Sequence, residues 1–314
     1  MVNTCSAFYP KAVTTTTATT ASARVPAHAY FVVSAVFHYL GPAFAVLLFA
    51  RIDVLGVAWL RIASAAVVFA LWRRPWETWP RLERDTRRLL LAWGAVLAAM
   101  NACFYLAIDR LPLGTVAAIE FLPVIALAAG AVRTRANLAA LLLAVAGVYL
   151  VTDVHLVDDP LGITFAAANA VLFALYIGLA HRVATSGQIG GVDGLALAMM
   201  IAAVVALPIG LADAVPAITD PVALAAAFGV GIASSVVPYV CDQLAMARLA
   251  RSTYALMVSL LPATATVLGA LILAQVPTLV EVAGVGLVVL GVALHRSPDR
   301  GSDIEGRTLR EVPA

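Results

Sequence analysis

Two oppositely charged side chains lie inside long apolar segments of this 314-residue sequence, where charges are rare. Arg61 lies seven residues into the segment that begins at Val54, and Glu120 lies seven residues into the one that begins at Leu113. An ionised group at membrane depth is costly, so such residues are candidates for function by default. A cation and a carboxylate at matched depth could bind the two ends of a zwitterionic solute.

Other polar side chains fall close to these two. At 1.5 Å per helical residue, Arg61 and Glu120 both lie about 10 Å below the outer ends of their segments. Two amides belong to this layer and three aromatic side chains lie within reach of it: Asn101 and Asn169, then Tyr105, Tyr176 and His38. These seven residues are the predicted solute-binding set. Two structural alternatives stay open: Arg61 and Glu120 could merely pair with each other, and His38 could make a single interhelical hydrogen bond.

Motifs of catalysis and cofactor binding are missing from the sequence. It contains no GxSxG, HExxH or Walker pattern, and its cysteines, Cys5, Cys103 and Cys241, form no CxxC. We therefore expect no enzyme activity, no metal and no cofactor. The net charge of +2 is too small to suggest a nucleic-acid partner.

The elements that would position these residues are membrane helices. The chain is 62% apolar and only 12% charged, whereas soluble domains carry about 25% charged residues. A helix needs roughly 20 apolar residues to cross a bilayer core of about 30 Å. Ten segments approach this length: 30–50, 54–72, 89–107, 113–131, 136–152, 161–180, 194–212, 222–241, 253–274 and 279–295. The longest connection between them is 73–88. The predicted fold is an all-α integral membrane protein with ten transmembrane helices.

Basic residues predict how these helices are oriented, because cytoplasmic loops are enriched in Lys and Arg. If the N-terminus lies inside, the outer loops hold only Arg51 and Arg110, and Arg61 lies within a helix. The other 17 of the 20 basic residues then fall in inner segments. Both termini are therefore predicted to be cytoplasmic, which requires an even number of helices.

Three short patterns recur in the same order. Ala-x-x-Arg-Leu-x-x-x-Thr-x-Ala occurs at 107–117 and 245–255, Leu-Pro at 122–123 and 261–262, and Val-Ala-Gly-Val at 145–148 and 282–285. Each repeat would hold five helices, so the second would enter the membrane upside down, a common construction of secondary transporters. We predict disordered tails at 1–29 and 297–314 around two five-helix halves, 30–152 and 153–296.

One stretch also resembles a known family. The sequences Asn-Ala-Cys-Phe-Tyr-Leu-Ala-Ile at 101–108, Leu-Pro-Leu-Gly at 111–114 and Ala-Ile-Glu-Phe-Leu-Pro at 118–123 resemble the drug/metabolite transporter superfamily with EamA domains. The nearest likeness is to its bacterial threonine/homoserine exporters. Weaker matches are Gly162, 174–176, Pro238-Tyr239 and 260–262.

The resemblance implies two inverted five-helix halves and export of small amino-acid-like metabolites in exchange for protons. It also assigns to Glu120 the role of that subgroup's intramembrane glutamate. One departure affects the coupling: Leu273-Ala274-Gln275 stands where the family often has Leu-Gly-Glu, so a charge is missing there.

Several functions stay open at this stage. The leading hypothesis is a secondary transporter in a bacterial plasma membrane that exports threonine, homoserine or related metabolites, and proton antiport is an open option. The alternatives are a permease for a drug or nucleotide sugar, an intramembrane lipid-modifying enzyme, and a membrane protein without flux. The expected partners are a small solute and the lipid bilayer, with protons and a second copy of the chain as further options.

Overall fold

The computed structural model describes residues 26–131, 134–156, 159–246 and 260–294, and these ranges contain helices and no strand. The long helices are α2 (Ala27–Leu48), α3 (Val54–Arg73), α4 (Arg84–Ile108), α5 (Leu113–Ala131), α6 (Arg135–Leu156), α7 (Pro160–Thr185), α8 (Gly191–Thr219), α9 (Pro221–Gly231), α10 (Val237–Met246), α12 (Leu261–Leu273) and α13 (Leu279–Leu294). Two 3-10 turns, Pro75–Glu77 and Trp79–Arg81, join α3 to α4, and a π-turn, Ile232–Val236, makes α9 continuous with α10. The predicted all-helical fold class is confirmed.

Each of the ten predicted segments overlaps a helix. Within the described residues, six helices are long and apolar enough to cross a membrane: α2, α3, α4, α7, α8 and the continuous α9–α10. The apolar stretches of α5, α6, α12 and α13 are shorter there. The start of the segment predicted at 253–274, most of the tail predicted at 1–29 and the whole tail predicted at 297–314 lie outside the described residues.

Helix α4 begins earlier than its predicted start at residue 89. It begins at Arg84, inside the segment expected to be a connection. Hydropathy marks only the apolar part of a helix, whereas its polar first turn satisfies its backbone outside the lipid. The charged residues Arg84 and Asp85 therefore belong to the helix and not to the loop.

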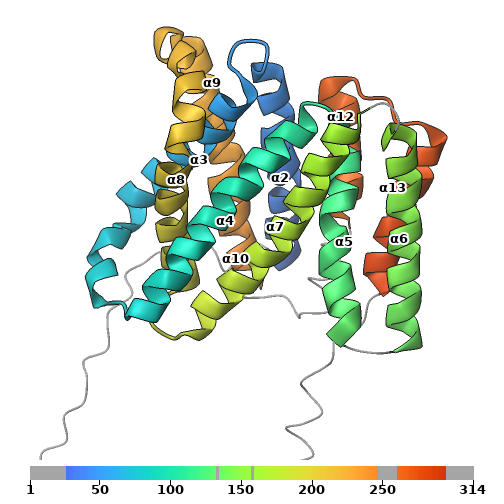
Figure 1. Cartoon of the computed structure of the whole chain (residues 1–314), viewed down its shortest axis with the longest axis horizontal. Helices are drawn as coiled ribbons and strands as arrows, with labels where there is room; N and C mark the ends of the chain where they lie inside the picture. The colour runs from blue at the N-terminus through green and yellow to red at the C-terminus, as the bar shows by residue number, and fades with distance from the viewer. Residues whose placement is uncertain (1–25, 132–133, 157–158, 247–259, 295–314) are drawn as a thin grey trace, which may run out of the picture.

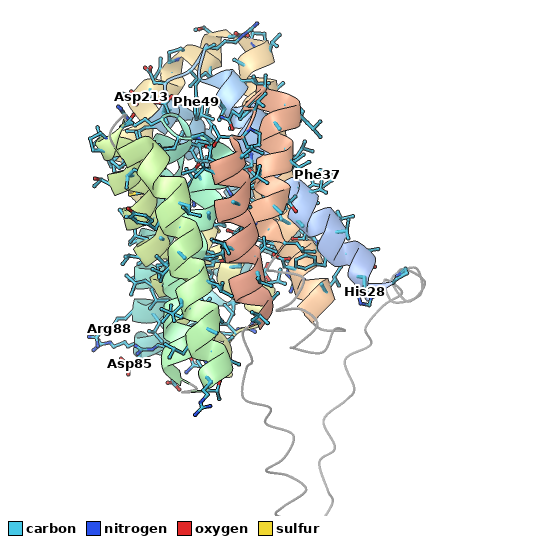
Figure 2. The ribbon with its side chains drawn as sticks, turned by 90° about the vertical axis from the view of Figure 1, so that its right-hand side faces the viewer. His28, Phe37, Phe49, Asp85, Arg88 and Asp213 are labelled. Atoms are coloured by element: carbon cyan, nitrogen blue, oxygen red, sulfur yellow. The ribbon has the colours of Figure 1, made fainter. Side chains whose placement is uncertain are left out.

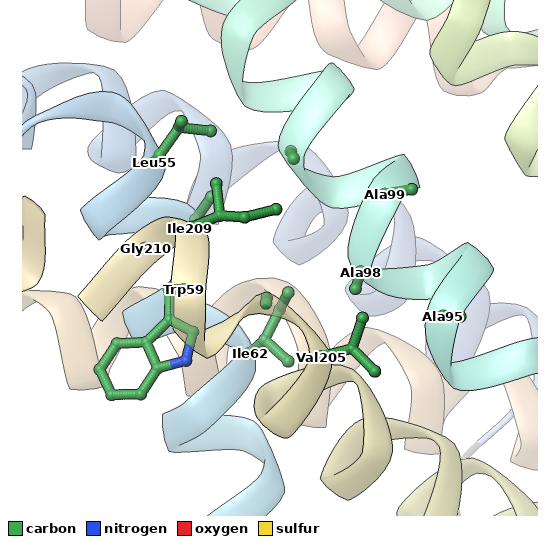
Figure 3. Close-up of a pocket in the computed structure, with 12 residues that line it drawn as sticks. Leu55, Trp59, Ile62, Ala95, Ala98, Ala99, Val205, Ile209 and Gly210 are labelled. Atoms are coloured by element: carbon green, nitrogen blue, oxygen red, sulfur yellow. The ribbon is translucent and has the colours of Figure 1, made fainter. Parts of the chain in front are cut away.

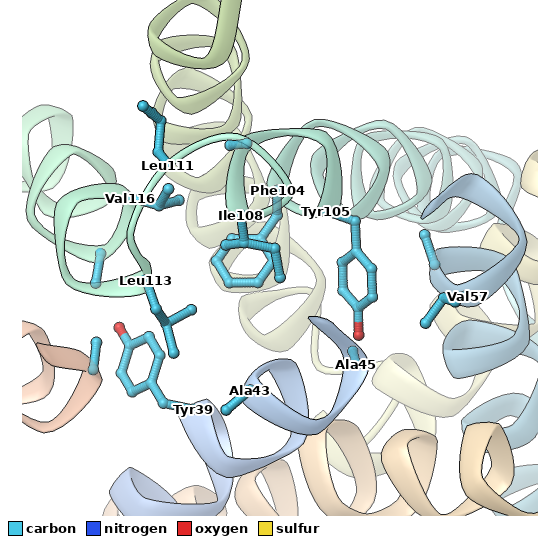
Figure 4. Packing of buried hydrophobic residues seen from close by; sticks show 14 of the residues in the cluster. Tyr39, Ala43, Ala45, Val57, Phe104, Tyr105, Ile108, Leu111, Leu113 and Val116 are labelled. Atoms are coloured by element: carbon cyan, nitrogen blue, oxygen red, sulfur yellow. The ribbon is translucent and has the colours of Figure 1, made fainter. Parts of the chain in front are cut away.

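The helices pack in pairs that join distant parts of the sequence (Figure 1). Helix α6 packs along α13, α3 along α8, α4 against α7 and α8, and α2 against α10. The larger apolar core includes Tyr39 of α2 and Phe104 and Tyr105 of α4 (Figure 4). On the outside of the bundle many large apolar side chains stay exposed, among them Leu71, Leu142 and Val204. Such an apolar exterior is unusual in water and suits contact with lipid.

Charged residues gather at the two ends of the bundle. Figure 2 shows Asp213 at one end of the bundle, the end at which Phe49 also lies, and Asp85 and Arg88 at the other end. Ion pairs join segments there: Arg51 to Asp220 at 3.1 Å, Arg110 to Asp159 at 3.4 Å, and Arg73 to Asp193 at 2.7 Å. Asp159 also caps α7, and the N–H of Gly162, followed by the nearby Arg110, holds the pKa of its carboxyl below the usual value.

The contact between α6 and α13 depends on glycine. A Cβ atom added to Gly147 would collide with the carbonyl oxygen of Gly284 and with Val288. We expect Gly147→Val to lower the free energy of unfolding by about 1–3 kcal/mol, because overpacking forces the two backbones apart. Thermal unfolding of the purified protein in detergent measures this effect. The control is Gly286→Ala on α13, where an added Cβ meets no atom within 4 Å; equal losses in both variants would contradict the expectation.

Candidate functional site

Arg61 lies in the middle of α3 and is only 7% exposed. Its guanidinium donates to the Oδ1 atom of Asn101 on α4, to the Oγ atom of Ser235 at 3.1 Å, and to the carbonyl oxygen of Ser234 at 3.1 Å. Three of the five guanidinium N–H donors thus have protein partners. Arg61 therefore joins α3 and α4 to the π-turn between α9 and α10.

Helix α4 contributes two side chains beside this guanidinium. The amide of Asn101 donates to the carbonyl of Leu97 at 2.8 Å, which turns its oxygen toward Arg61. Tyr105, one helical turn further and thus on the same face, lies under the guanidinium at 5.5 Å from Cζ to ring centroid. The Tyr105 hydroxyl is buried near Ser234 without a hydrogen bond of ordinary geometry in the described part of the chain. We call Arg61, Asn101, Tyr105, Ser234 and Ser235 the basic pole.

Glu120 lies on α5 and is 5% exposed. Asn169 of α7 donates from Nδ2 to its Oε1 atom at 3.1 Å. The other amide atom, Oδ1 of Asn169, is buried and has no hydrogen-bond partner among the described residues, and neither has the Tyr39 hydroxyl. Tyr39 lies close enough to Glu120 for the two groups to interact electrostatically. We call Glu120, Asn169 and Tyr39 the acidic pole.

The two poles are near each other but are not an ion pair. The charge of Arg61 acts on Glu120, yet within the described residues no Arg61 nitrogen comes within 4 Å of a Glu120 oxygen. Each charged group is held by neutral polar side chains from other helices. Direct pairing, one of the structural alternatives for Arg61 and Glu120, is therefore not the arrangement in this structure.

Aromatic side chains lie between and around the poles. Tyr239 of α10 is within electrostatic range of both Arg61 and Glu120, and its hydroxyl is hydrogen-bonded to Tyr176 of α7. Tyr176 also stacks on Phe173, with the ring centroids 6.2 Å apart. His38 lies within range of Arg61 and edge-on to Tyr39, at 5.2 Å between centroids. The structure thus brings all seven predicted residues into one region.

The chain is similar to known membrane transporters. The pattern of the EamA-like transporter family matches residues 160–296. The threonine/homoserine exporter RhtA of Escherichia coli (strain K12) is 30% identical over 253 residues, which cover 79% of this chain and 84% of that exporter. The chain belongs to the EamA-like transporter family. RhtA of Salmonella typhimurium (strain LT2) is 29% identical over 277 residues, 87% of this chain and 88% of that exporter.

Membership of the EamA-like transporter family places the chain among membrane transporters and not among enzymes. The bacterial threonine/homoserine exporters that it resembles match the subgroup expected from 101–123. Among the described residues, no three His, Cys, Asp or Glu side chains come together as metal ligands would.

Not every hollow of this EamA-like protein suits a charged solute. A groove of about 110 Å³ between α3, α4 and α8 is lined by side chains such as Leu55, Ile62 and Ile209 (Figure 3). The polar atom of Trp59 in its wall is already bonded to the carbonyl of Ala203 at 3.0 Å. A zwitterion would find no partner for its charges there, so the buried poles are the better candidate site.

Sequence reasoning missed four residues in or beside the two poles: Tyr39, Ser234, Ser235 and Tyr239. Tyr39 and Tyr239 resembled ordinary core aromatics in apolar segments. A signal for Ser234 was present, because residue 238 is a proline. In an α-helix the N–H of residue 238 would bond to the carbonyl of residue 234, and proline has no N–H. The Ser234 carbonyl therefore needs a hydrogen-bond donor from elsewhere.

The position that departs from the family pattern has a structural role. The N–H of Leu113, at the start of α5, donates to Oε1 of Gln275 at 3.1 Å. Ala274 has a φ of 53°, in the left-handed region that glycine adopts without strain. The glycine-to-alanine difference therefore costs backbone strain here, and the amide of Gln275 serves to cap a helix.

Proposed function

We propose that this protein exports threonine, homoserine or a similar small zwitterion, with Arg61 facing the solute carboxylate and Glu120 facing its ammonium group. The observation that carries this proposal is the pair of buried, opposite charges held apart by neutral side chains. An isolated buried charge is expensive, and each pole would be neutralised by the opposite end of a zwitterion. The match to threonine/homoserine exporters supports the same class of solute.

Unused polar atoms beside the charges support the same reading. Buried polar groups are nearly always hydrogen-bonded, and exceptions call for an explanation such as an absent ligand. Asn169 Oδ1 and the hydroxyls of Tyr39 and Tyr105 are such exceptions among the described residues. An ammonium group offers donors to Asn169 and Glu120, and a carboxylate offers acceptors to Tyr105 and Arg61.

Overexpression of the protein is expected to raise the tolerance of cells to toxic concentrations of threonine or homoserine. Proteoliposomes that contain the purified protein should exchange radiolabelled threonine, and the Arg61→Ala variant serves as the control for leakage. Selective transport of a drug or a nucleotide sugar would replace the proposed substrate. Absence of transport for every amino acid, analogue and drug tested would overturn the exporter proposal.

We also propose that ten helices form two inverted halves, 30–152 and 153–296. Contacts between the halves occur in equivalent pairs, and these pairs support this arrangement. Gly94 of α4 abuts Ala198 and Ile201 of α8, whereas Gly231 of α9 abuts Arg61 and Ser64 of α3. Each residue of the first contact is 137 positions from its counterpart in the second, as the two Val-Ala-Gly-Val repeats are from each other.

Helices at equivalent positions of the two proposed halves also pack in equivalent pairs. Helices α4 and α7 pack together, and so do their counterparts α10 and α2. Gly147 and Gly284, which are 137 positions apart, touch each other, as equivalent residues do on a two-fold axis. The family match at 160–296 falls within the second proposed half.

The orientation of the helices has its own test. With both termini in the cytoplasm, reporter fusions after Ala136 and Ser297 should report the inside, and a fusion after Leu161 should report the outside. The ion pairs of Arg51 and Arg110 with Asp220 and Asp159 would then lie on the outer side. A C-terminal reporter on the outside would rule out the ten-helix arrangement.

A further inference from the structure

The π-turn at Ile232–Val236 marks a single extra residue in the second half of the chain. Before it, equivalent residues of the two halves are 137 positions apart, as Gly94 and Gly231 are. Directly after it, the offset is 138, because the pattern at 107–117 recurs at 245–255; it is 139 at Leu-Pro and returns to 137 at Val-Ala-Gly-Val. The N–H of Val237 donates to the carbonyl of Ile232, five residues earlier. A π-turn of this kind takes up one more residue than an α-turn and leaves the flanking helix in register.

A backbone carbonyl and a side-chain hydroxyl of the π-turn are available to Arg61. Pro238 removes the N–H that would have reached the Ser234 carbonyl in an α-helix, and the guanidinium of Arg61 donates to that carbonyl at 3.1 Å. The Ser235 hydroxyl accepts from Nε of Arg61 at 3.1 Å. Both serines are buried. The turn therefore presents two oxygens from adjacent residues to one buried cation.

Neighbouring glycines and a serine fix the turn itself in place. Gly231 has no room for a Cβ beside Ser64 and the Arg61 backbone, and Gly41 of α2 has none beside Ser234. The Ser64 hydroxyl donates to the Arg61 carbonyl at 3.0 Å without touching the guanidinium. The turn is thus held against both α2 and α3 at the level of the basic pole.

The first half has no equivalent of this arrangement in the described residues. Positions 95–99 of α4 correspond to 232–236 and form ordinary α-helix. The counterpart of Arg61, 137 positions later, is the apolar Ala198. A π-turn that the fold itself required would be expected in both proposed halves. Among the described residues, the π-turn occurs only in the second half, where it faces the Arg61 cation.

We propose that the one-residue insertion in α9–α10 positions the Arg61 guanidinium for the solute carboxylate, and that Ser235 is the positioning residue. The inference rests on the proposed function. The oxygens of Ser234 and Ser235 hold one edge of the planar fork, so its remaining N–H groups keep a fixed direction. Loss of this support weakens binding of a carboxylate without removing the positive charge.

Three variants test the inference in threonine exchange by proteoliposomes. Ser235→Ala is expected to raise the KM for threonine about tenfold with little change in kcat, because a hydrogen bond to a charged group is lost. Ser235→Thr keeps the hydroxyl and is expected to restore a KM near that of the wild type. The control, Thr266→Val on α12, removes a half-buried hydroxyl that donates to the Pro262 carbonyl at 3.0 Å, and its KM is expected to be unchanged.

Deletion of Ala233 tests the insertion itself. It shortens the π-turn to an α-turn, and we expect a higher KM together with normal membrane insertion. If this variant does not fold, the Ser235 series decides. An unchanged KM in Ser235→Ala, or equal effects of Ser235→Ala and Thr266→Val, would overturn the inference while leaving the exporter proposal intact. Failure of the wild-type protein to transport any amino acid would overturn both.

Discussion

Replacement of Arg61 by alanine is expected to abolish export while the protein still reaches the membrane. The change removes the only charge that we assign to the solute carboxylate. It also leaves the oxygens of Asn101, Ser234 and Ser235 without the donor that now satisfies them. Truncating one partner of a buried charge pair between a protein and its ligand costs about 2–5 kcal/mol of binding, which corresponds to a loss of roughly 30-fold or more.

Initial rates of threonine exchange in proteoliposomes measure this loss, and the amount of inserted protein is determined in parallel. Arg61→Lys is the matched variant: it keeps the charge but loses the planar fork that reaches three acceptors, so we expect partial activity. The double variant Arg61→Leu with Glu120→Leu separates the two interpretations of the site. Robust, pH-dependent export by the double variant would remove both residues from the mechanism.

Replacement of Glu120 by glutamine is expected to abolish the dependence of export on pH. Glutamine keeps an oxygen that can accept from Asn169, as Oε1 of Glu120 does at 3.1 Å, so the packing between α5 and α7 should be retained. What it loses is the ability to take up and release a proton. If Glu120 exchanges a proton for the solute ammonium group, the glutamine variant should show a slower, pH-independent exchange.

Exchange rates over a series of pH values, with and without an imposed proton gradient, test this expectation. The control is Glu281→Gln on α13, because Glu281 is also a buried carboxylate, at 7% exposure. It accepts from the N–H of Thr278, just before α13, and it lines a pocket with Thr115 of α5, so it is a second buried carboxylate beside the same helix as Glu120. A pH profile that stays intact in Glu120→Gln, or that vanishes equally in Glu281→Gln, would contradict proton exchange at Glu120.

The contacts of Arg61 join the two proposed halves at the place where the solute would bind. In this structure the guanidinium bonds to α4 in the first proposed half and to the π-turn in the second. A solute carboxylate would accept from the N–H groups that these acceptors leave free, through charge-assisted hydrogen bonds, which are the stronger kind. Binding would therefore neutralise the cation while its contacts to both proposed halves stay in place.

The amino-acid sequence alone determined where the apolar helical segments lie and predicted how deep the charges are. Bilayer thickness sets the length of an apolar segment, and unsatisfied backbone groups are not tolerated in lipid, so ten segments could be placed without a structure. Because the helical rise per residue is constant, equal spacing from Val54 and Leu113 placed Arg61 and Glu120 at matched depth. Conserved spacing between repeated patterns likewise indicated two related halves.

Only the tertiary structure decided which side chains meet. Depth does not say how a helix is rotated about its axis, and that rotation follows from packing, such as the close approach of Gly231 to Arg61 and Ser64. It turned Arg61 toward Asn101 and the π-turn, and it turned Glu120 toward Asn169, so the two charges face neutral partners instead of each other. Ser234 and Ser235 belong to the site for the same reason: the Ser234 carbonyl and the Ser235 hydroxyl accept from Arg61 only because helix packing brings the guanidinium to them.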